Sequence, residues 1–109
     1  MFRNHSPEGY HQVLDKIELK TLAFGEKTLL SEFRLRKGAK LPSHSHPHEQ
    51  TGYLVSGLLE LTIGGETFLA EPGAAWSVPP DVEHSGVAKQ ACVAIEVFSP
   101  PREDYLKLV

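Results

Sequence analysis

Short apolar runs alternate with glycine- and proline-containing turns along most of the chain. The runs are rich in Val, Leu, Ile, Phe and Thr, and such runs between turn signals are typical of the strands of a sandwich or barrel. The pattern therefore predicts an all-β fold in a single domain. We expect its strands at residues 17–22, 29–36, 50–56, 58–63, 66–70, 75–78, 84–87 and 91–98.

Glycine and proline pairs mark the connections between these strands. Gly64-Gly65 lies between two alternating runs at the spacing of a two-residue hairpin turn. Ser56-Gly57 is a second hairpin signal. Pro72-Gly73 and the segment Pro79-Pro80-Asp81 predict further turns, because proline presets φ while glycine and aspartate tolerate a left-handed backbone.

The two ends of the chain differ from its middle. Residues 1–15 are expected to form an arm, with Tyr10, Val13 and Leu14 as its anchors. Near the other end, Ser99 precedes two prolines and two acids, a pattern that favours the start of a short helix capped by the serine. Residues 16–109 are thus expected to form a barrel together with this short C-terminal helix.

Composition narrows the class of protein. The chain has 109 residues, enough for one core, and its net charge of −3 is close to balance. Without a basic stripe we expect no nucleic acid partner, and without a long apolar run we expect no membrane span. The N-terminus lacks the apolar segment of a signal peptide. The single Cys92 lies in an apolar run, where we expect a buried thiol, and a cytoplasmic location is the resulting expectation.

Histidines cluster between residues 44 and 50. Alternate side chains of a strand share a face, so His44, His46 and Gln50 are expected to point to the same side. His84 would join them from a later strand. Three imidazoles and a carboxamide oxygen suit one divalent transition metal, and the set accepts Ni, Zn, Fe, Mn, Co or Cu. The pattern therefore predicts a metal site inside the barrel.

The residues around these ligands are harder to place. His48 shares the parity of the ligands, but a further ligand from the same strand would crowd the site, so we expect it at the rim, in contact with a substrate. Glu49 has the opposite parity and is expected outside, although a bulge at Pro47 would reverse this expectation. His5 and His11, in the arm, are expected to be solvated.

The last predicted strand has two alternating faces, and the sequence does not say which one points inward. Glu96 is either an outward charge or an inward acid in an apolar pocket, where burial would raise its pKa and suit it to proton transfer. Arg102 is either a surface charge or a group that holds a substrate carboxylate through two hydrogen bonds. The two faces consist of Val93, Ile95 and Val97 on one side and of Ala94, Glu96 and Phe98 on the other.

Two segments resemble the sequence motifs of the cupin superfamily. Residues 38–57 match G-x5-H-x-H-x3-[E/Q]-x6-G, and residues 73–88 resemble G-x5-P-x-G-x2-H-x3-N. Gln50 stands where glutamate is commoner, Asp81 replaces a glycine and Ala88 replaces an asparagine. The resemblance implies an RmlC-like jelly-roll barrel and a bound metal. Because cupins are often dimers, it also leads us to expect a homodimer.

A narrower resemblance links the chain to the KdgF-type pectin-degradation cupins. Members of that family open unsaturated uronates, the sugars that pectate and alginate lyases leave behind, into linear keto forms. The resemblance therefore implies a small sugar-acid substrate. It rests on the segments 44–50, 52–53, 56–57, 62–66, 79–80 and 97–105.

The same resemblance assigns roles to individual residues. Glu96 falls on the acid/base position, where the family pattern has aspartate. Arg102 falls on the arginine that grips the substrate, and Phe98 on the aromatic residue near the acid. The implied metal ligands are His44, His46, Gln50 and His84.

The sequence does not settle where the other aromatic side chains lie, and it allows functions other than uronate ring opening. Trp76 and Phe98 are expected to line the substrate pocket, whereas for Phe33 and Tyr53 a place in the core is favoured. A metal-dependent dioxygenase would use open metal positions for oxygen and a chelating substrate. A sugar- or metal-binding module would bind without turnover, and a structural cupin would fold without regard to metal, because one fold hosts many functions.

Overall fold

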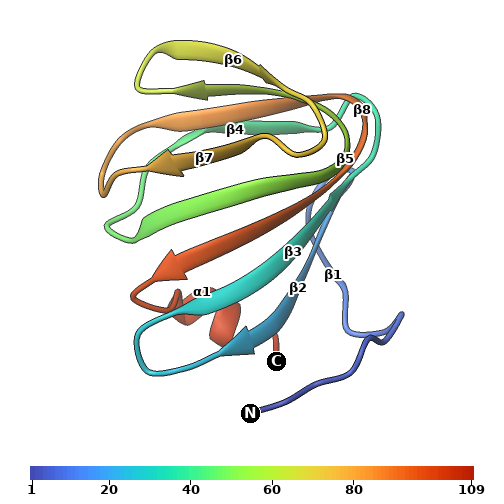
Figure 1. The fold of residues 1–109 in the computed structure, drawn as a ribbon, viewed down its shortest axis with the longest axis vertical. Helices are drawn as coiled ribbons and strands as arrows, with labels where there is room; N and C mark the ends of the chain where they lie inside the picture. The colour runs from blue at the N-terminus through green and yellow to red at the C-terminus, as the bar shows by residue number, and fades with distance from the viewer.

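The computed structural model describes residues 1–109 as a sheet of antiparallel strands curled into a barrel, followed by one short helix (Figure 1). Strands β5 and β8 are much longer than the others and pair with each other along most of their length. The predicted all-β fold is confirmed. The elements are β1 (His11–Leu14), β2 (Ile17–Phe24), β3 (Leu29–Leu35), β4 (Lys40–His44), β5 (Glu49–Ile63), β6 (Glu66–Ala70), β7 (Ala75–Val78), β8 (His84–Ser99) and α1 (Glu103–Leu106).

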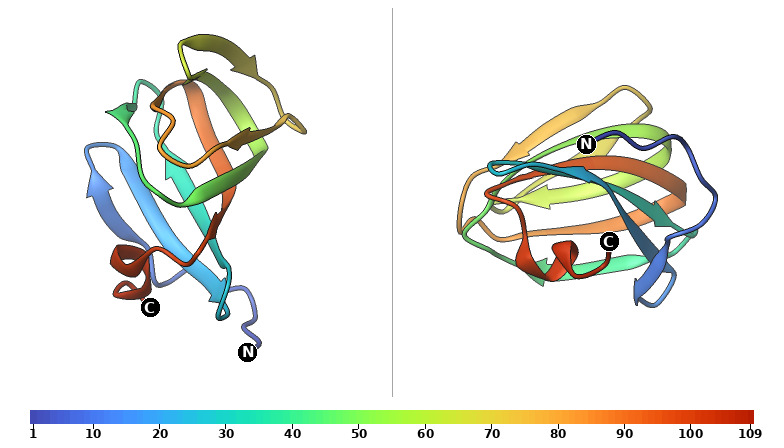
Figure 2. Two further views of the ribbon diagram at one scale, coloured as in Figure 1. Left: turned by 90° about the vertical axis from the view of Figure 1, so that its left-hand side faces the viewer. Right: turned by 90° about the horizontal axis from the view of Figure 1, so that it is seen from below.

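The strand order makes β8 the centre of the sheet. One path of paired strands runs β1-β2-β3-β8-β5-β6, while β4 also pairs with β8 and β7 also pairs with β5. The two long strands therefore bend to take different neighbours along their length. Figure 2 shows that this curling leaves α1 and both chain termini at the same end of the molecule.

Two long strands replace two pairs of predicted ones. Residues 50–56 and 58–63 belong to the single strand β5, so the hairpin turn predicted at Ser56-Gly57 is wrong. Gly57, at φ +94°, lies among register shifts of the kind that let a strand bend and continue. Residues 84–87 and 91–98 likewise belong to β8. A glycine between two alternating runs can mark a turn between two strands or a bulge within one strand, so the sequence alone does not distinguish them.

Among the short elements, one predicted hairpin is confirmed and two strands were not predicted. The hairpin predicted at Gly64-Gly65 is confirmed, since Ile63 pairs with Glu66 across it. Strands β1 and β4 lie outside the predicted set. All of β1 is exposed, and β4 contains Pro42 and little apolar surface, so neither carries the alternation of a half-buried strand. Strand β1 also gives regular structure to part of the segment expected to be an arm.

We expect Gly57→Ala to destabilise the fold by about 2–4 kcal/mol. The added methyl group would lie closer than 3.0 Å to the carbonyl oxygen of Ala91 and to the Cα atom of Cys92, and backbone atoms cannot swing away as a side chain can. Gly65→Ala is the matched control, because Gly65 also has a positive φ (+84°) but has open space around it. Denaturant unfolding would measure both free energies. Equal losses would contradict the role given to the close contact.

The structure shows which of the two faces of β8 points into the barrel. Ala94, Glu96 and Phe98 are buried, with at most 6% of their surface exposed. Their partners on the flanking strands β3 and β5 include Leu29 and Leu54, which are fully buried core residues. Glu96 is therefore an acid inside the barrel.

Three other expectations concern single side chains. Cys92 is buried in the core as expected, and Phe33 packs against the same core. Tyr53 is neither core nor pocket wall, because 49% of it is exposed. In the first half of β5, before its register shifts, Gln50 and Leu54 at even positions point inward, so Tyr53 points outward.

The helix begins later than predicted. Ser99 does not cap it; its hydroxyl donates instead to the carbonyl oxygen of Lys27 at 2.7 Å. Arg102 is the N-cap residue, and Glu103 and Asp104 place the expected acids in the first turn. No helix of the structure is both long and apolar enough to cross a membrane.

One of the expected anchors holds the N-terminal segment to the sheet. The Tyr10 hydroxyl donates to the Glu32 carboxylate at 2.8 Å, and the Arg34 guanidinium lies 4.0 Å from the centroid of the Tyr10 ring. Val13 and Leu14 are 38% and 40% exposed, so they lie outside the buried core, and both line a groove together with apolar residues of β2, β3 and β4.

Candidate metal centre

Three histidines from three parts of the chain meet inside one end of the barrel. His44 ends β4 and pairs with His84, the first residue of β8, so that their ring centroids lie 4.1 Å apart. His46 lies in the connection between β4 and β5, and its ring centroid is 4.9 Å from that of His84. One ring nitrogen from each histidine lies within 4.8 Å of the others. The predicted convergence is confirmed for these residues.

The convergence does not arise in the way the sequence suggested. His44, His46 and Gln50 do not share one strand, because β4 ends at His44 and β5 begins at Glu49. The chain turns between them, and each side chain reaches the site from its own direction. Glu49 is exposed and points away, as expected.

The segment that carries His46 is held from a distant turn. The backbone N–H of Asp81 donates to the carbonyl oxygen of His46 at 2.8 Å. Asp81 has φ +65°, a left-handed conformation that explains why glycine is usual at this motif position and why aspartate is tolerated. The second motif thus supports a histidine of the first.

Each of the three imidazoles is oriented by a backbone carbonyl. A carbonyl oxygen can only accept, so the Nδ1 atom of each ring donates a proton to it, and the neutral ring keeps its lone pair on Nε2. Hydrogen bonds of this kind fix the tautomer of metal-binding histidines. The acceptors are the carbonyl oxygens of Pro42 for His44, of His48 for His46 and of Val82 for His84, each at 2.9 Å.

The nitrogen and oxygen atoms that face the middle of the histidine cluster are hydrogen-bond acceptors, and none of them carries a proton to share with the others. The Nε2 atom of His46 lies 3.0 Å from the Oε1 atom of Gln50, so a neutral ring sets two lone pairs against each other. The Nε2 atom of His84 is buried and has no hydrogen-bond partner. A cation would satisfy all of these atoms at once. The site therefore fits a divalent transition metal held by three nitrogen atoms and one amide oxygen.

Burial favours the neutral form of the His46 and His84 imidazoles. It lowers the pKa of both His46 and His84, because a charged ring is poorly solvated in the barrel, and the positive charge of Arg102 acts in the same direction. Neutral imidazole is the form that ligates metals.

Glu96 lies directly behind Gln50. The Nε2 atom of Gln50 donates to Oε2 of Glu96, and the indole Nε1 of Trp76 donates to Oε1 at 3.0 Å. Burial raises the pKa of Glu96 to about 8, although the two hydrogen bonds act to lower it. The inward alternative for Glu96 is therefore the one observed.

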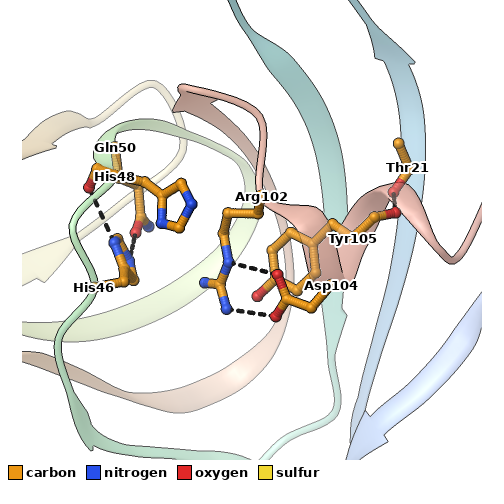
Figure 3. Close-up of polar contacts among 7 residues, drawn as sticks. All are labelled: Thr21, His46, His48, Gln50, Arg102, Asp104 and Tyr105. Atoms are coloured by element: carbon orange, nitrogen blue, oxygen red, sulfur yellow. Dashed lines mark hydrogen bonds and ion pairs between the residues drawn. The ribbon is translucent and has the colours of Figure 1, made fainter.

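Arg102 is the N-cap residue of α1, and Figure 3 shows it between His48 and the pair formed by Asp104 and Tyr105. Its Nε and Nη2 atoms donate to the Asp104 carboxylate at 3.1 and 2.7 Å. Its guanidinium stacks 4.0 Å from the centroid of the Tyr105 ring, and only 16% of its side chain is exposed. The alternative of a free surface charge does not hold. Asp104 and Tyr105 are site residues that the sequence analysis missed, and their only signal was their nearness to Arg102.

Two hollows adjoin the histidine cluster. An inner cavity of about 50 Å³ has mostly apolar walls, together with Gln50, His84 and Glu96. A groove outside is lined by His44, Arg102, two residues of α1 and apolar residues of β1 to β4. The expected acid and the expected carboxylate-binding group thus line different hollows, which share Ile17, Phe33 and Leu41 as walls.

The other three predicted substrate contacts differ in how exposed they are and in what they contact. Trp76 is half-buried and lines the inner cavity, and His48 lies half-buried beside His46 with its ring centroid 5.6 Å away. Phe98 is only 1% exposed and lines neither hollow. It packs edge-on against His46 and lies 5.2 Å beneath the Arg102 guanidinium, so it supports both.

The chain matches known proteins over most of its length. Residues 31–98 match the family model Cupin_2, described as a cupin domain. The "Pectin degradation protein KdgF" of Dickeya dadantii (strain 3937) is 28% identical over 99 residues, which cover 89% of this chain and 90% of that protein. A solved RmlC-like cupin from Shewanella frigidimarina NCIMB 400 has a TM-score of 0.85 at 28% identity, over 88% of this chain and 86% of its own. KdgF from Halomonas sp. has a TM-score of 0.84 at 31% identity, over 87% and 88%.

Proposed function

Because this chain belongs to the cupin domain family, we propose that it is a metal-dependent enzyme that opens unsaturated uronate sugars to linear keto forms. One observation carries the proposal: three imidazoles and an amide oxygen converge beside an arginine that has one edge free. A cation and a guanidinium side by side suit a small molecule that carries both hydroxyl groups and a carboxylate.

The ligand set is suited to an anionic substrate. His44, His46, His84 and Gln50 would hold one divalent transition metal, which when bound polarises the sugar oxygen atoms that coordinate it. All four ligands are neutral, so they leave the positive charge of the ion uncompensated. A site with this charge favours a sugar acid over a neutral sugar.

Arg102 would hold the uronate carboxylate. Asp104 occupies the edge of the guanidinium formed by Nε and Nη2, which leaves the edge formed by Nη1 and Nη2 for a second carboxylate. The Tyr105 ring supports the guanidinium from one face. His44 lines the same outer groove as Arg102, so a carboxylate bound there would lie next to the ligand cluster.

Glu96 would move the protons that the reaction requires. Ring opening breaks the bond between the ring oxygen and the hemiacetal carbon, the hemiacetal hydroxyl loses its proton, and the ring oxygen becomes an enol. The enol then loses its proton while a carbon of the double bond gains one, so the net change is an isomerisation. A carboxyl group that accepts hydrogen bonds at both oxygens still has a lone pair on each with which to take up a proton at Oε1 or Oε2. We propose His48 and Trp76 as the remaining substrate contacts.

The direct test is an assay with unsaturated uronate monomers. We expect the metal-loaded protein to accelerate the loss of the conjugated double bond, followed by ultraviolet absorbance, and the chelated protein to return to the spontaneous rate. The methyl ester of the same sugar is the matched control for the carboxylate. It should react at least about 10-fold more slowly, because a charge-assisted pair with Arg102 is worth about 1.5–3 kcal/mol. No acceleration with any of the proposed metals would refute the enzymatic proposal.

A second candidate is a module that binds a sugar acid without turning it over. It is favoured by the separation of Glu96, which lines the inner cavity, from Arg102, which lines the outer groove. It predicts metal-dependent, saturable binding of the same sugars and no loss of the double bond.

A further inference from the structure

The carboxamide of Gln50 has two ends, and only its oxygen can ligate a metal. The chain must therefore determine which end faces the three histidines. We propose that Glu96 and Trp76 are positioning residues that hold the Gln50 amide with its oxygen toward the metal ligands. This role goes beyond the sugar chemistry and rests only on the proposed metal site.

The first contact in this arrangement joins Glu96 to Gln50. The Oε2 atom of Glu96 takes the hydrogen bond from Gln50 Nε2 at the back of the side chain. Both oxygens of Glu96 accept hydrogen bonds, one from Gln50 and one from Trp76, so the amide nitrogen faces Glu96 and the amide oxygen faces His46, 3.0 Å away. A rotated amide would set its oxygen against the carboxylate and its N–H groups against the lone pair of the imidazole.

The second contact joins Trp76 to Glu96. The indole N–H of Trp76 donates to Oε1, the oxygen that Gln50 does not use, at 3.0 Å. The carboxylate is thus held at both oxygens, and Glu96 is only 6% exposed. A carboxylate fixed at two points offers Gln50 one well-defined acceptor. Outer hydrogen bonds of this kind orient metal ligands in proteins.

Gly52 makes room for this arrangement. It pairs with Trp76 on β7 and with Glu96 on β8, so the bond between the indole and the carboxylate passes over it. A Cβ atom at position 52 would lie closer than 3.0 Å to both the Trp76 Nε1 and the Glu96 Oε1 atoms. The missing side chain is therefore part of what allows a residue of β7 to reach a residue of β8 across β5.

A double-mutant cycle with Co²⁺ as the probe tests the proposal. Apo protein is titrated with Co²⁺, and the visible absorption of the ion reports both affinity and ligand geometry. We expect Glu96→Ala to weaken Co²⁺ binding about 10- to 100-fold and to change the spectrum. In a Gln50→Ala background the same change should cost less than about 2-fold, because Glu96 then has no ligand to position. Glu66→Ala, at the exposed β5–β6 hairpin, is the matched control and should leave binding unchanged.

Trp76→Phe provides a second variant if the loss of Glu96 impairs folding. It keeps an aromatic ring in place and removes the donor N–H, so a several-fold loss of Co²⁺ affinity is expected, again absent in the Gln50→Ala background. Losses that multiply in the double variants would overturn the positioning role, as would an unchanged Co²⁺ affinity and spectrum. Failure of the unaltered protein to bind Co²⁺ at all would overturn both this proposal and the metal site. Since no sugar is present, the sugar chemistry can fail while this proposal stands.

Discussion

Replacing His84 with alanine should remove both the bound metal and the activity, with a loss of turnover of about 1000-fold or more. The Nε2 atom of His84 is buried, has no hydrogen-bond partner and points into the ligand cluster. Its ring also faces that of His44 across the paired strands β4 and β8. Without it, two imidazoles and an amide oxygen remain, and a neutral amide oxygen is a weak ligand for most transition metals, so it does not make up for the lost imidazole.

The fold should survive this substitution. The variant loses a buried imidazole and its hydrogen bond to the Val82 carbonyl, so the metal-free form should lose about 1–3 kcal/mol of stability and still unfold in one cooperative transition. Metal content after dialysis and the rate of double-bond loss are the two measurements. His11→Ala, at an exposed position of β1, is the control and should keep both. An alanine variant at position 84 that retains one metal per chain with unchanged affinity would contradict the assignment of the ligands.

Replacing Glu96 with glutamine should lower turnover about 100- to 10,000-fold at saturating metal, which is the usual contribution of a positioned acid or base. Glutamine has nearly the same shape, so the packing of the barrel interior is kept. A carboxamide neither takes up nor releases a proton in the required range, so proton transfer fails even when the metal is bound.

Saturating metal is essential to this comparison, because Glu96 also touches Gln50 and its loss is expected to weaken metal binding. Glu66→Gln, on the exposed β5–β6 hairpin, provides the control for the chemical change alone. Turnover within 5-fold of the unaltered protein would exclude Glu96 as the proton-transfer group. It would leave positioning of the Gln50 amide as its role, which metal affinity measures independently.

The strands and the ligand types could be read from the sequence because both are local properties. Period-two alternation marks a strand wherever one face is buried, and the hairpin at Gly64-Gly65 needs only its own neighbours to form. Where local signals have two meanings, sequence reasoning failed. Gly57 signals a turn and a bulge equally, and only the pairing of β5 with β8 shows that the strand continues.

The geometry of the site was decided by tertiary structure. The parity argument named side chains that do converge, but its reason was wrong, because His44, His46 and Gln50 lie on two strands and the turn between them. Their convergence depends on contacts far apart in the chain, such as the hydrogen bond from Asp81 to the His46 carbonyl. No short-range pattern encodes contacts of this kind.

By itself, the sequence determined that the chain forms β-strands, that it offers three imidazoles and an amide for one metal, and that an acid and an arginine follow in its last fifteen residues. Only the tertiary structure decided that Glu96 points inward and accepts hydrogen bonds from Gln50 and, across Gly52, from Trp76. It also decided that Asp104 takes one edge of the Arg102 guanidinium. The physical reason is that alternation defines two faces of a strand, whereas burial of one face depends on which strands pair beside it. For β8 those strands are β3 and β5, and their core residues Leu29 and Leu54 place Glu96 inside the barrel.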